Sequence, residues 1–271
     1  MRLTSSQIHA YHRDGFIVLE DLLASAEVAA MKADLERIQK IDTDHLVREK
    51  AGGVAKTIYR VHEANGPTAS PIFHAVSHAP RLLQPAQDLL ADEAVYIHHT
   101  KCNLKTAIDG SVWTWHQDYG TWKRDGMPEA RPTTALVMLD EPTEMNGCLY
   151  FIPGSHKLGG LEPRFDESTG YKFWVVPKEE MIDIMVRSPA PVAIKGRPGT
   201  VVFFDSNILH ASGHNLSRHD RWAIYIVYNP VANRCREVPN PRPDYVRSTN
   251  FKPLVAGSDD ILANLSSELE A

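Results

Sequence analysis

The chain has 271 residues, of which 43% are hydrophobic and 23% charged, a composition typical of one large globular domain and unlike that of long disordered segments. The net charge of −5 disfavours a nucleic-acid-binding protein, and no apolar run approaches the roughly 18 residues of a membrane span. The first residues lack the apolar core of a secretory signal, and three widely spaced cysteines, Cys102, Cys148 and Cys235, argue against a disulfide framework or zinc ribbon. We therefore expect a cytoplasmic protein without nucleic-acid or membrane partners.

Three helical patterns occupy the first ninety residues. Thr4 and Gln7 fit a capping box that opens a short helix ending near Gly15. A second helix of about four turns is indicated by apolar residues that repeat at three and four positions. This apolar stripe consists of Val28, Met31, Leu35 and Ile38. A third helix is predicted over 79–90, whereas the polar residues 42–56 are expected to form a loop or a mobile segment.

Short β-rich runs dominate the chain beyond residue 94, and glycine or proline separates most of them. Together with an early run at 16–19, these runs are 95–97, 133–139, 148–152, 192–194, 201–204 and 222–228. Many short strands with such turns predict an all-β sandwich or jelly roll, with the N-terminal helices packed on one face. Residues 155–190 have few strand signals and are expected to form a long insertion, of the kind that often serves as a lid.

The segment Trp113–Tyr119, with the sequence Trp-Thr-Trp-His-Gln-Asp-Tyr, carries the clearest chemical signal. Positions i and i+2 of a strand face the same way, so His116 and Asp118 can present an imidazole and a carboxylate to one point. A third, distant histidine would complete the 2-His-1-carboxylate set that binds non-haem Fe(II) and leaves coordination positions open. The His-x-Asp pattern alone is weak, because the chain holds a second copy at 12–14 that has an ordinary structural interpretation at a helix end.

His210 is the candidate third ligand, since it follows the buried-strand pattern at 201–205. Eleven residues later Arg221 opens another apolar strand, and a hairpin would bring Arg221 close to His210. A guanidinium there could form a two-pronged ion pair with a small dicarboxylate beside the metal. Ser212 could donate its hydroxyl to the same carboxylate.

These features together resemble the phytanoyl-CoA dioxygenase family of Fe(II)- and 2-oxoglutarate-dependent oxygenases. The matching motifs are Trp-His-Gln-Asp at 115–118, Asn-Gly-Cys-Leu-Tyr-Phe-Ile-Pro-Gly-Ser-His-Lys at 146–157, Phe204-Asp205 with His210, and Arg221. The resemblance covers about residues 8–230. It implies a mainly β fold with flanking helices, the cupin-like double-stranded β-helix or jelly roll, with iron on His116, Asp118 and His210 and with Arg221 on the distal carboxylate of 2-oxoglutarate.

Within that family the run at 115–128 is most similar to the ectoine hydroxylases. The upstream segment 98–105 parallels the strand that lines their pocket, but His99 stands where that subgroup has an amide and Lys101 where it has an arginine that meets the substrate. His99 and Asn103 are candidates to contact 2-oxoglutarate or iron-bound water, or to make ordinary strand hydrogen bonds. Lys101 is a candidate partner for an acidic group of the substrate, or else a surface lysine.

Two aromatic residues, Trp122 and Tyr119, are expected either to wall the substrate pocket or to pack in the core. Three other histidines are not expected to bind the metal. His156 should stabilise a loop, and His214 and His219 should be exposed in a turn. Halogenases of related fold carry a small residue at the position of Asp118, so a carboxylate there favours hydroxylation.

The resemblance implies a dioxygenase that hydroxylates an unactivated C–H bond of a small molecule and releases succinate and CO2, with Fe(II), 2-oxoglutarate and O2 as cofactor and co-substrates. The substrate would be an amino acid, another zwitterion or a natural-product intermediate, although an acyl-CoA stays open. Two other interpretations remain: a non-catalytic jelly-roll ligand-binding module, and a zinc-dependent hydrolase with the same triad. Neither gives Arg221 a role.

We expect one domain over 1–271, with N-terminal helices at about 4–90, a jelly-roll core at about 94–230 and a tail at about 231–271. The oligomeric state stays open between a monomer and a homodimer.

Overall fold

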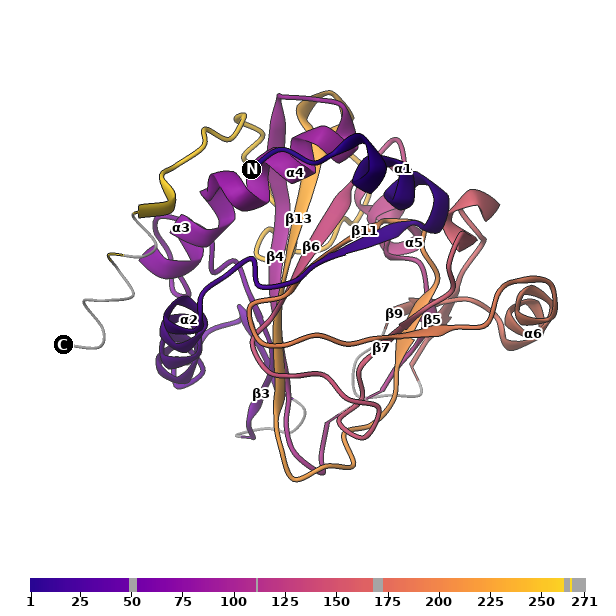
Figure 1. Ribbon diagram of the computed structural model, residues 1–271, viewed down its shortest axis with the longest axis horizontal. Helices are drawn as coiled ribbons and strands as arrows, with labels where there is room; N and C mark the ends of the chain where they lie inside the picture. The colour runs from indigo at the N-terminus through magenta and orange to yellow at the C-terminus, as the bar shows by residue number, and fades with distance from the viewer. Residues whose placement is uncertain (49–52, 111, 168–172, 261–263, 265–271) are drawn as a thin grey trace.

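Two antiparallel sheets stacked face to face form the body of the protein (Figure 1). The computed structural model describes residues 1–48, 53–110, 112–167, 173–260 and 264. The larger sheet has the order β1 (Phe16–Leu19), β11 (Val201–Asp205), β6 (Thr133–Met138), β13 (Arg221–Pro230), β4 (Val95–Lys105), β3 (Ala55–Tyr59) and β2 (Leu46–Arg48). The smaller sheet has the order β10 (Val192–Ile194), β7 (Leu149–Phe151), β12 (His210–Ser212) and β5 (Trp113–His116). The predicted mainly β jelly roll with flanking helices is confirmed.

Helices cover one face of the larger sheet. In Figure 1, α2 (Ser25–Ile38), α3 (Pro71–His78) and α4 (Pro80–Leu90) lie on one side of the long strands β4 and β13, and the smaller sheet lies on the other. The remaining helices are α1 (Ser5–Asp14), α5 (Asp118–Trp122) and α6 (Lys178–Arg187), with 3₁₀ turns η1 (Lys123–Asp125), η2 (Ser155–Leu158) and η3 (Val231–Asn233).

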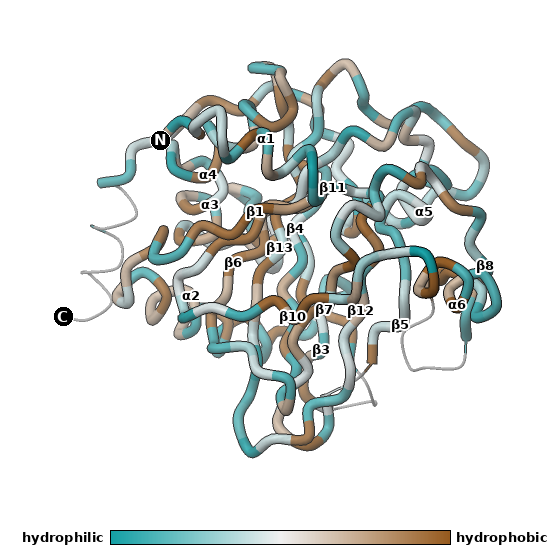
Figure 2. Tube along the Cα trace, turned by 45° about the vertical axis from the view of Figure 1, so that its right-hand side comes forward, coloured by the Kyte–Doolittle hydropathy of each residue, from teal (hydrophilic) through white to brown (hydrophobic). Residues whose placement is uncertain are grey.

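Alternation along the central strands creates two separate apolar layers, because successive side chains point to opposite faces. On β13, Ile224 and Ile226 pack with the helices, whereas Ala223 and Tyr225 face the smaller sheet. Strand β11 divides its residues between the same two layers. Figure 2 shows the hydrophobic residues concentrated in these strands and the adjoining helices. The layer between the sheets is the one that receives the functional side chains.

The N-terminal predictions are largely confirmed. Thr4 and Gln7 form the capping box of α1, and Gly15 ends that helix with φ +86°, a left-handed conformation that glycine adopts without strain. The apolar stripe of α2 is buried. The loop predicted over 42–56 is wrong in part, because β2 and β3 lie there, and residues 49–52 fall outside the described part. These strands were missed because the polar residues of β3 are buried where it pairs with β4 and β2 pairs in turn with β3, and no local pattern reveals such long-range pairing.

The insertion at 155–190 contains the hairpin of β8 (Arg164–Asp166) and β9 (Phe173–Val175), followed by α6. The C-terminal tail runs back along the protein, where Ser248 N donates to His98 O and Leu254 N donates to Val95 O. Among the described residues, no helix is long and apolar enough to cross a bilayer.

Candidate functional site

His116, Asp118 and His210 meet in the space between the two sheets. His116 ends β5 and His210 begins β12, and the two are directly paired across these strands. The Asp118 Oδ1 atom lies 3.8 Å from His116 Nε2 and 3.9 Å from His210 Nε2. One ligand atom from each of the three side chains falls within 4.8 Å of the others, which is the spacing of ligands around a single metal ion.

Asp118 does not lie on a strand, contrary to the sequence interpretation. β5 ends at His116, and Asp118 is the first residue of α5. The turn into this helix still directs the carboxylate toward both imidazoles. The prediction that His116 and Asp118 lie close together was correct, but the strand geometry used to explain it was wrong. The helix α5 was not expected because five residues are too few to show a helical period.

The backbone fixes the orientation of both imidazole rings. His116 Nδ1 lies 2.7 Å from Thr114 O, and His210 Nδ1 lies 3.0 Å from Ile208 O, so each Nδ1–H donates to a carbonyl and each Nε2 lone pair faces Asp118. Burial lowers the pKa of His116 well below its ordinary value and also lowers that of His210. Neutral imidazoles with a carboxylate fit a ferrous ion, which requires unprotonated nitrogen ligands.

Arg221 approaches this space from the opposite sheet. It begins β13, directly opposite Lys105 of β4, and shares the inward face of its strand with Ala223. The predicted hairpin with His210 is wrong, because β12 belongs to the smaller sheet and β13 to the larger. Arg221 is only 3% exposed, and in the described part of the chain its Nε and Nη2 atoms have no hydrogen-bond partner. A buried guanidinium group with two nitrogen atoms that lack an acceptor is suited to binding an anionic ligand.

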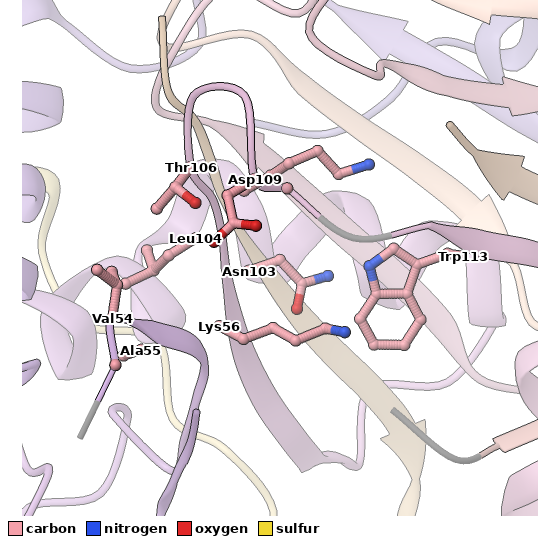
Figure 3. A pocket seen from close by; sticks show the side chains of 11 residues that line it. Val54, Ala55, Lys56, Asn103, Leu104, Thr106, Asp109 and Trp113 are labelled. Atoms are coloured by element: carbon pink, nitrogen blue, oxygen red, sulfur yellow. The ribbon is translucent and has the colours of Figure 1, made fainter. Parts of the chain in front are cut away.

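Ser212 and Asn103 lie along the same interior. Ser212 is paired with Leu149 of β7, and Leu149 also lines a small recess with Arg221. Asn103 is paired with Ala223 on the inward face of β4. Figure 3 shows its amide extending with the side chain of Lys56 toward the indole ring of Trp113. Of the predicted 2-oxoglutarate-binding residues, Arg221, Ser212 and Asn103 thus face the interior between the two sheets.

A cavity of about 300 Å³ adjoins the triad, and His116 and Asp118 form part of its wall. Three residues predicted from the sequence line it, namely His99, Lys101 and Trp122. Tyr119 does not, and its hydroxyl donates to Pro128 O at 2.9 Å. Tyr119 instead packs with Trp122 in a small apolar cluster, so the core alternative holds for this residue.

The cavity also receives residues that the sequence did not mark. They are Tyr59, Trp113, Thr121, Phe165, Phe173, Trp174 and Arg242. Phe173 contacts the His116 ring edge to face at 5.0 Å. Arg242 comes from the C-terminal tail and forms a two-pronged ion pair with the buried carboxylate of Asp125. Neither the tail nor the β8–β9 hairpin carries a motif, so only tertiary folding shows that they reach this cavity.

Lys101 is the central cation of the cavity. Its Nζ lies 4.6 Å from the ring centre of Trp113 and 5.3 Å from that of Tyr225. Desolvation lowers the pKa of Lys101 to about 8, while the charge of Asp118 acts in the opposite direction. An ammonium held between aromatic faces is ready to bind an anionic group that enters the cavity.

The three histidines that were not expected to bind metal lie outside the triad, as predicted. His156 Nε2 contacts His12 O at 3.2 Å and so joins η2 to α1. His214 and His219 are exposed in the connection between β12 and β13. None of the three lies in the group around Asp118.

Comparison with known proteins places this fold and site in a family. The family model described as Phytanoyl-CoA dioxygenase (PhyH) matches residues 11–223. The chain belongs to the phytanoyl-CoA dioxygenase family. It is 32% identical over 258 residues to an ectoine dioxygenase of Bordetella bronchiseptica, covering 90% of this chain and 82% of that protein. The predicted family and its likeness to the ectoine hydroxylases are thus confirmed, and this member of the phytanoyl-CoA dioxygenase family is a dioxygenase.

Two crystal structures of EctD from S. alaskensis match with a TM-score of 0.82 over 96% of this chain and 89% of theirs. One, 32% identical, contains 2-oxoglutarate and 5-hydroxyectoine, and the other, 31% identical, contains bound iron. With the triad in place, these relatives confirm the predicted iron, 2-oxoglutarate and dioxygen chemistry. They give no support to a non-catalytic binding module or a zinc hydrolase.

Proposed function

We propose that this protein hydroxylates a compact, carboxylate-bearing zwitterion, with His116, Asp118 and His210 as the ligands of Fe(II). The observation that carries the proposal is the convergence of these three side chains beside a cavity that His116 and Asp118 help to line and that holds the ammonium group of Lys101. Ferrous iron, 2-oxoglutarate and dioxygen together supply the oxidising power that inserts one oxygen atom into a C–H bond while the other enters succinate.

The other predicted site residues are assigned either to 2-oxoglutarate or to the substrate. Arg221, Ser212 and Asn103 bind 2-oxoglutarate, with Arg221 on its distal carboxylate, because its buried donors require an anion. Lys101 and Trp122 bind the substrate. His99 lines the substrate cavity rather than the small recess beside Arg221, so we assign it to substrate positioning in preference to co-substrate binding.

The charge and size of the cavity support this substrate class. Among the described lining residues Asp118 is the only acidic one, and it is assigned to the metal, whereas Lys101 supplies a positive charge and the charge of Arg242 is shared with Asp125. About 300 Å³ lies at the small end of ligand sites and suits a molecule of amino-acid size. Aromatic walls can hold the cationic part of a zwitterion on their faces. Ectoine, for which the relatives are named, is such a molecule, but His99 and Lys101 differ from the pocket residues of that subgroup.

The reaction is tested by anaerobic addition of Fe(II) and 2-oxoglutarate, for which we expect a visible absorption band from the keto-acid chelate. His116→Ala and Asp118→Ala should lose this band and the release of succinate. Turnover without dioxygen, or with zinc in place of iron, would contradict the proposal.

The substrate class is tested by succinate release in the presence of ectoine, other small zwitterions, amines that lack a carboxylate, and acyl-CoAs. Carboxylated zwitterions should stimulate release, and Lys101→Met should raise their KM by about tenfold or more, the loss expected for one charge-assisted hydrogen bond. Stimulation by carboxylate-free amines or by acyl-CoAs alone would contradict this substrate class.

A further inference from the structure

Lys105 is a buried lysine that bridges the two sheets and has no role in the function proposed above. It ends β4 in the larger sheet and is 4% exposed. Its Nζ atom reaches across the interior to the smaller sheet, where it donates to Ser212 Oγ at 2.9 Å. It also donates to the carbonyl oxygens of Gly213 and Gly147. Three donors of the ammonium group thus meet three acceptors.

The bond to Lys105 determines what the Ser212 hydroxyl can do. An ammonium group only donates, so Ser212 Oγ is the acceptor and its own proton must go to another group. Ser212 has no such acceptor among the described residues. Leu149 is paired with Ser212 and lines the same recess as Arg221. The hydroxyl proton of Ser212 is therefore available beside the guanidinium group of Arg221, whose Nε and Nη2 atoms also lack a partner in the described part of the chain.

A glycine turn keeps the ammonium in place. Gly147 has φ +74°, and a Cβ atom there would come within 2.9 Å of Lys105 Nζ and 2.5 Å of Gly213 O. Asn146 secures this turn, since its Oδ1 accepts from Thr143 N at 2.7 Å and its Nδ2 donates to Glu141 O at 2.9 Å. The Asn-Gly pair of the 146–157 motif therefore has a physical purpose, because only glycine leaves room for the ammonium and the two carbonyls.

Lys105 and Arg221 are directly paired on neighbouring strands, so two cations lie side by side in a buried interior. Like charges in this arrangement repel each other, and an anion between or beside them relieves the repulsion. The serine hydroxyl, the guanidinium and the neighbouring ammonium all favour a carboxylate at the same place.

We propose that Lys105 is a positioning residue for the co-substrate, which holds Ser212 Oγ so that the hydroxyl proton points at the distal carboxylate of 2-oxoglutarate beside Arg221. The inference rests on the proposed function, since it takes 2-oxoglutarate as the ligand. Lys105 does not touch the reacting atoms. It acts through Ser212 and through its charge, and its loss should weaken binding of the distal carboxylate while the keto-acid end stays bound.

The test compares two ligands that differ only at that end. 2-Oxopentanoate carries a methyl group where 2-oxoglutarate has its distal carboxylate. Binding of both to the Mn(II)-loaded protein is measured by titration calorimetry for wild type and Lys105→Met. We expect a loss of about tenfold or more for 2-oxoglutarate, the size of a lost charge-assisted hydrogen bond, and a change below about twofold for 2-oxopentanoate. In turnover, the KM for 2-oxoglutarate should rise while kcat at saturation stays close to wild type.

Matched variants separate this role from a general structural one. Lys32→Met removes another lysine near the start of β13, on the helix-covered face where Lys32 pairs with Asp140, and should leave both affinities unchanged. Ser212→Ala and the double variant with Lys105→Met should be non-additive, because the lysine acts through the serine. If Lys105→Met does not fold, Lys105→Gln replaces it with the same expectation.

Equal losses for both ligands, or unchanged binding of 2-oxoglutarate, would overturn the role of Lys105. Either result would leave the proposed function intact, provided that the wild-type protein forms its visible chelate band. Absence of that band in wild type would instead refute the proposed function.

Discussion

The imidazole rings of His116 and His210 lie 4.1 Å apart, centre to centre, with their planes tilted by 48°. These residues are direct partners on β12 and β5, two antiparallel strands at one edge of the smaller sheet. The sheet therefore fixes two of the three metal ligands before any ion binds, and only Asp118 approaches from a different element.

This arrangement predicts the effect of removing one ring. His210→Ala should weaken binding of Fe(II) or Mn(II) by at least about 100-fold, because loss of an outer-shell partner alone already costs up to that amount. Titration calorimetry of the metal-free protein measures the change. His219→Ala, in the exposed turn after β12, is the control and should bind metal as wild type does. Equal affinities of His210→Ala and wild type would remove His210 from the ligand set.

Arg221 should lower the stability of the ligand-free protein although it is needed to bind 2-oxoglutarate. Its buried Nε and Nη2 have no partner in the described part of the chain, so Arg221→Met should raise the free energy of unfolding of the ligand-free protein by about 1 kcal/mol or more. The same variant should lose affinity for 2-oxoglutarate. Urea unfolding with and without the ligand tests both parts, with the exposed Arg197→Met as control. A less stable variant that still binds 2-oxoglutarate would contradict this prediction.

The ion pair between Arg242 and Asp125 should anchor the tail at the substrate cavity. Asp125 is buried, so Arg242→Met leaves an uncompensated carboxylate and should destabilise the protein by about 3–5 kcal/mol. Adding Asp125→Asn should restore a large part of this loss, since the amide has no charge to compensate. Thermal unfolding of the two single variants and the double variant forms the cycle. Additive effects would show that the pair is not coupled.

His98 should make the protein sensitive to acid. Burial lowers the pKa of His98 from its ordinary value near 6.5 to about 3 in the folded state. The unfolded chain therefore takes up a proton first, so the stability contributed by neutral His98 is complete above about pH 6.5 and declines as the pH falls toward 3. Each pH unit in this window costs about 1.4 kcal/mol per such group.

His98→Phe keeps a ring against Trp122 without a titrating group. The slope of unfolding free energy against pH, measured between pH 4 and 6 by urea unfolding, should become shallower by about 1.4 kcal/mol per pH unit. His219→Phe controls for the loss of a histidine at the surface. An unchanged slope in His98→Phe would mean that this residue is protonated in the folded protein.

Features that depend on neighbours along the chain could be predicted from the amino-acid sequence. The capping box at Thr4 follows from side chains three residues apart, and the stripe of α2 follows from helical periodicity. Glycine and proline between apolar runs indicated the strands of the jelly roll. His116 and Asp118 could be paired as metal ligands because two residues span a short distance in almost any backbone conformation.

Which distant residues share the interior with the triad depends on how the two sheets and the tail pack together. Arg221 reaches it from the opposite sheet and not through a hairpin with His210, and Arg242 arrives from a tail without any motif. The side chain of Tyr119 packs in an apolar cluster, although this residue directly follows the metal ligand Asp118. The physical reason is that sheet stacking and tail packing minimise exposed apolar surface and unpaired buried charge over the whole chain, and the resulting side-chain neighbours have no period or spacing in the sequence.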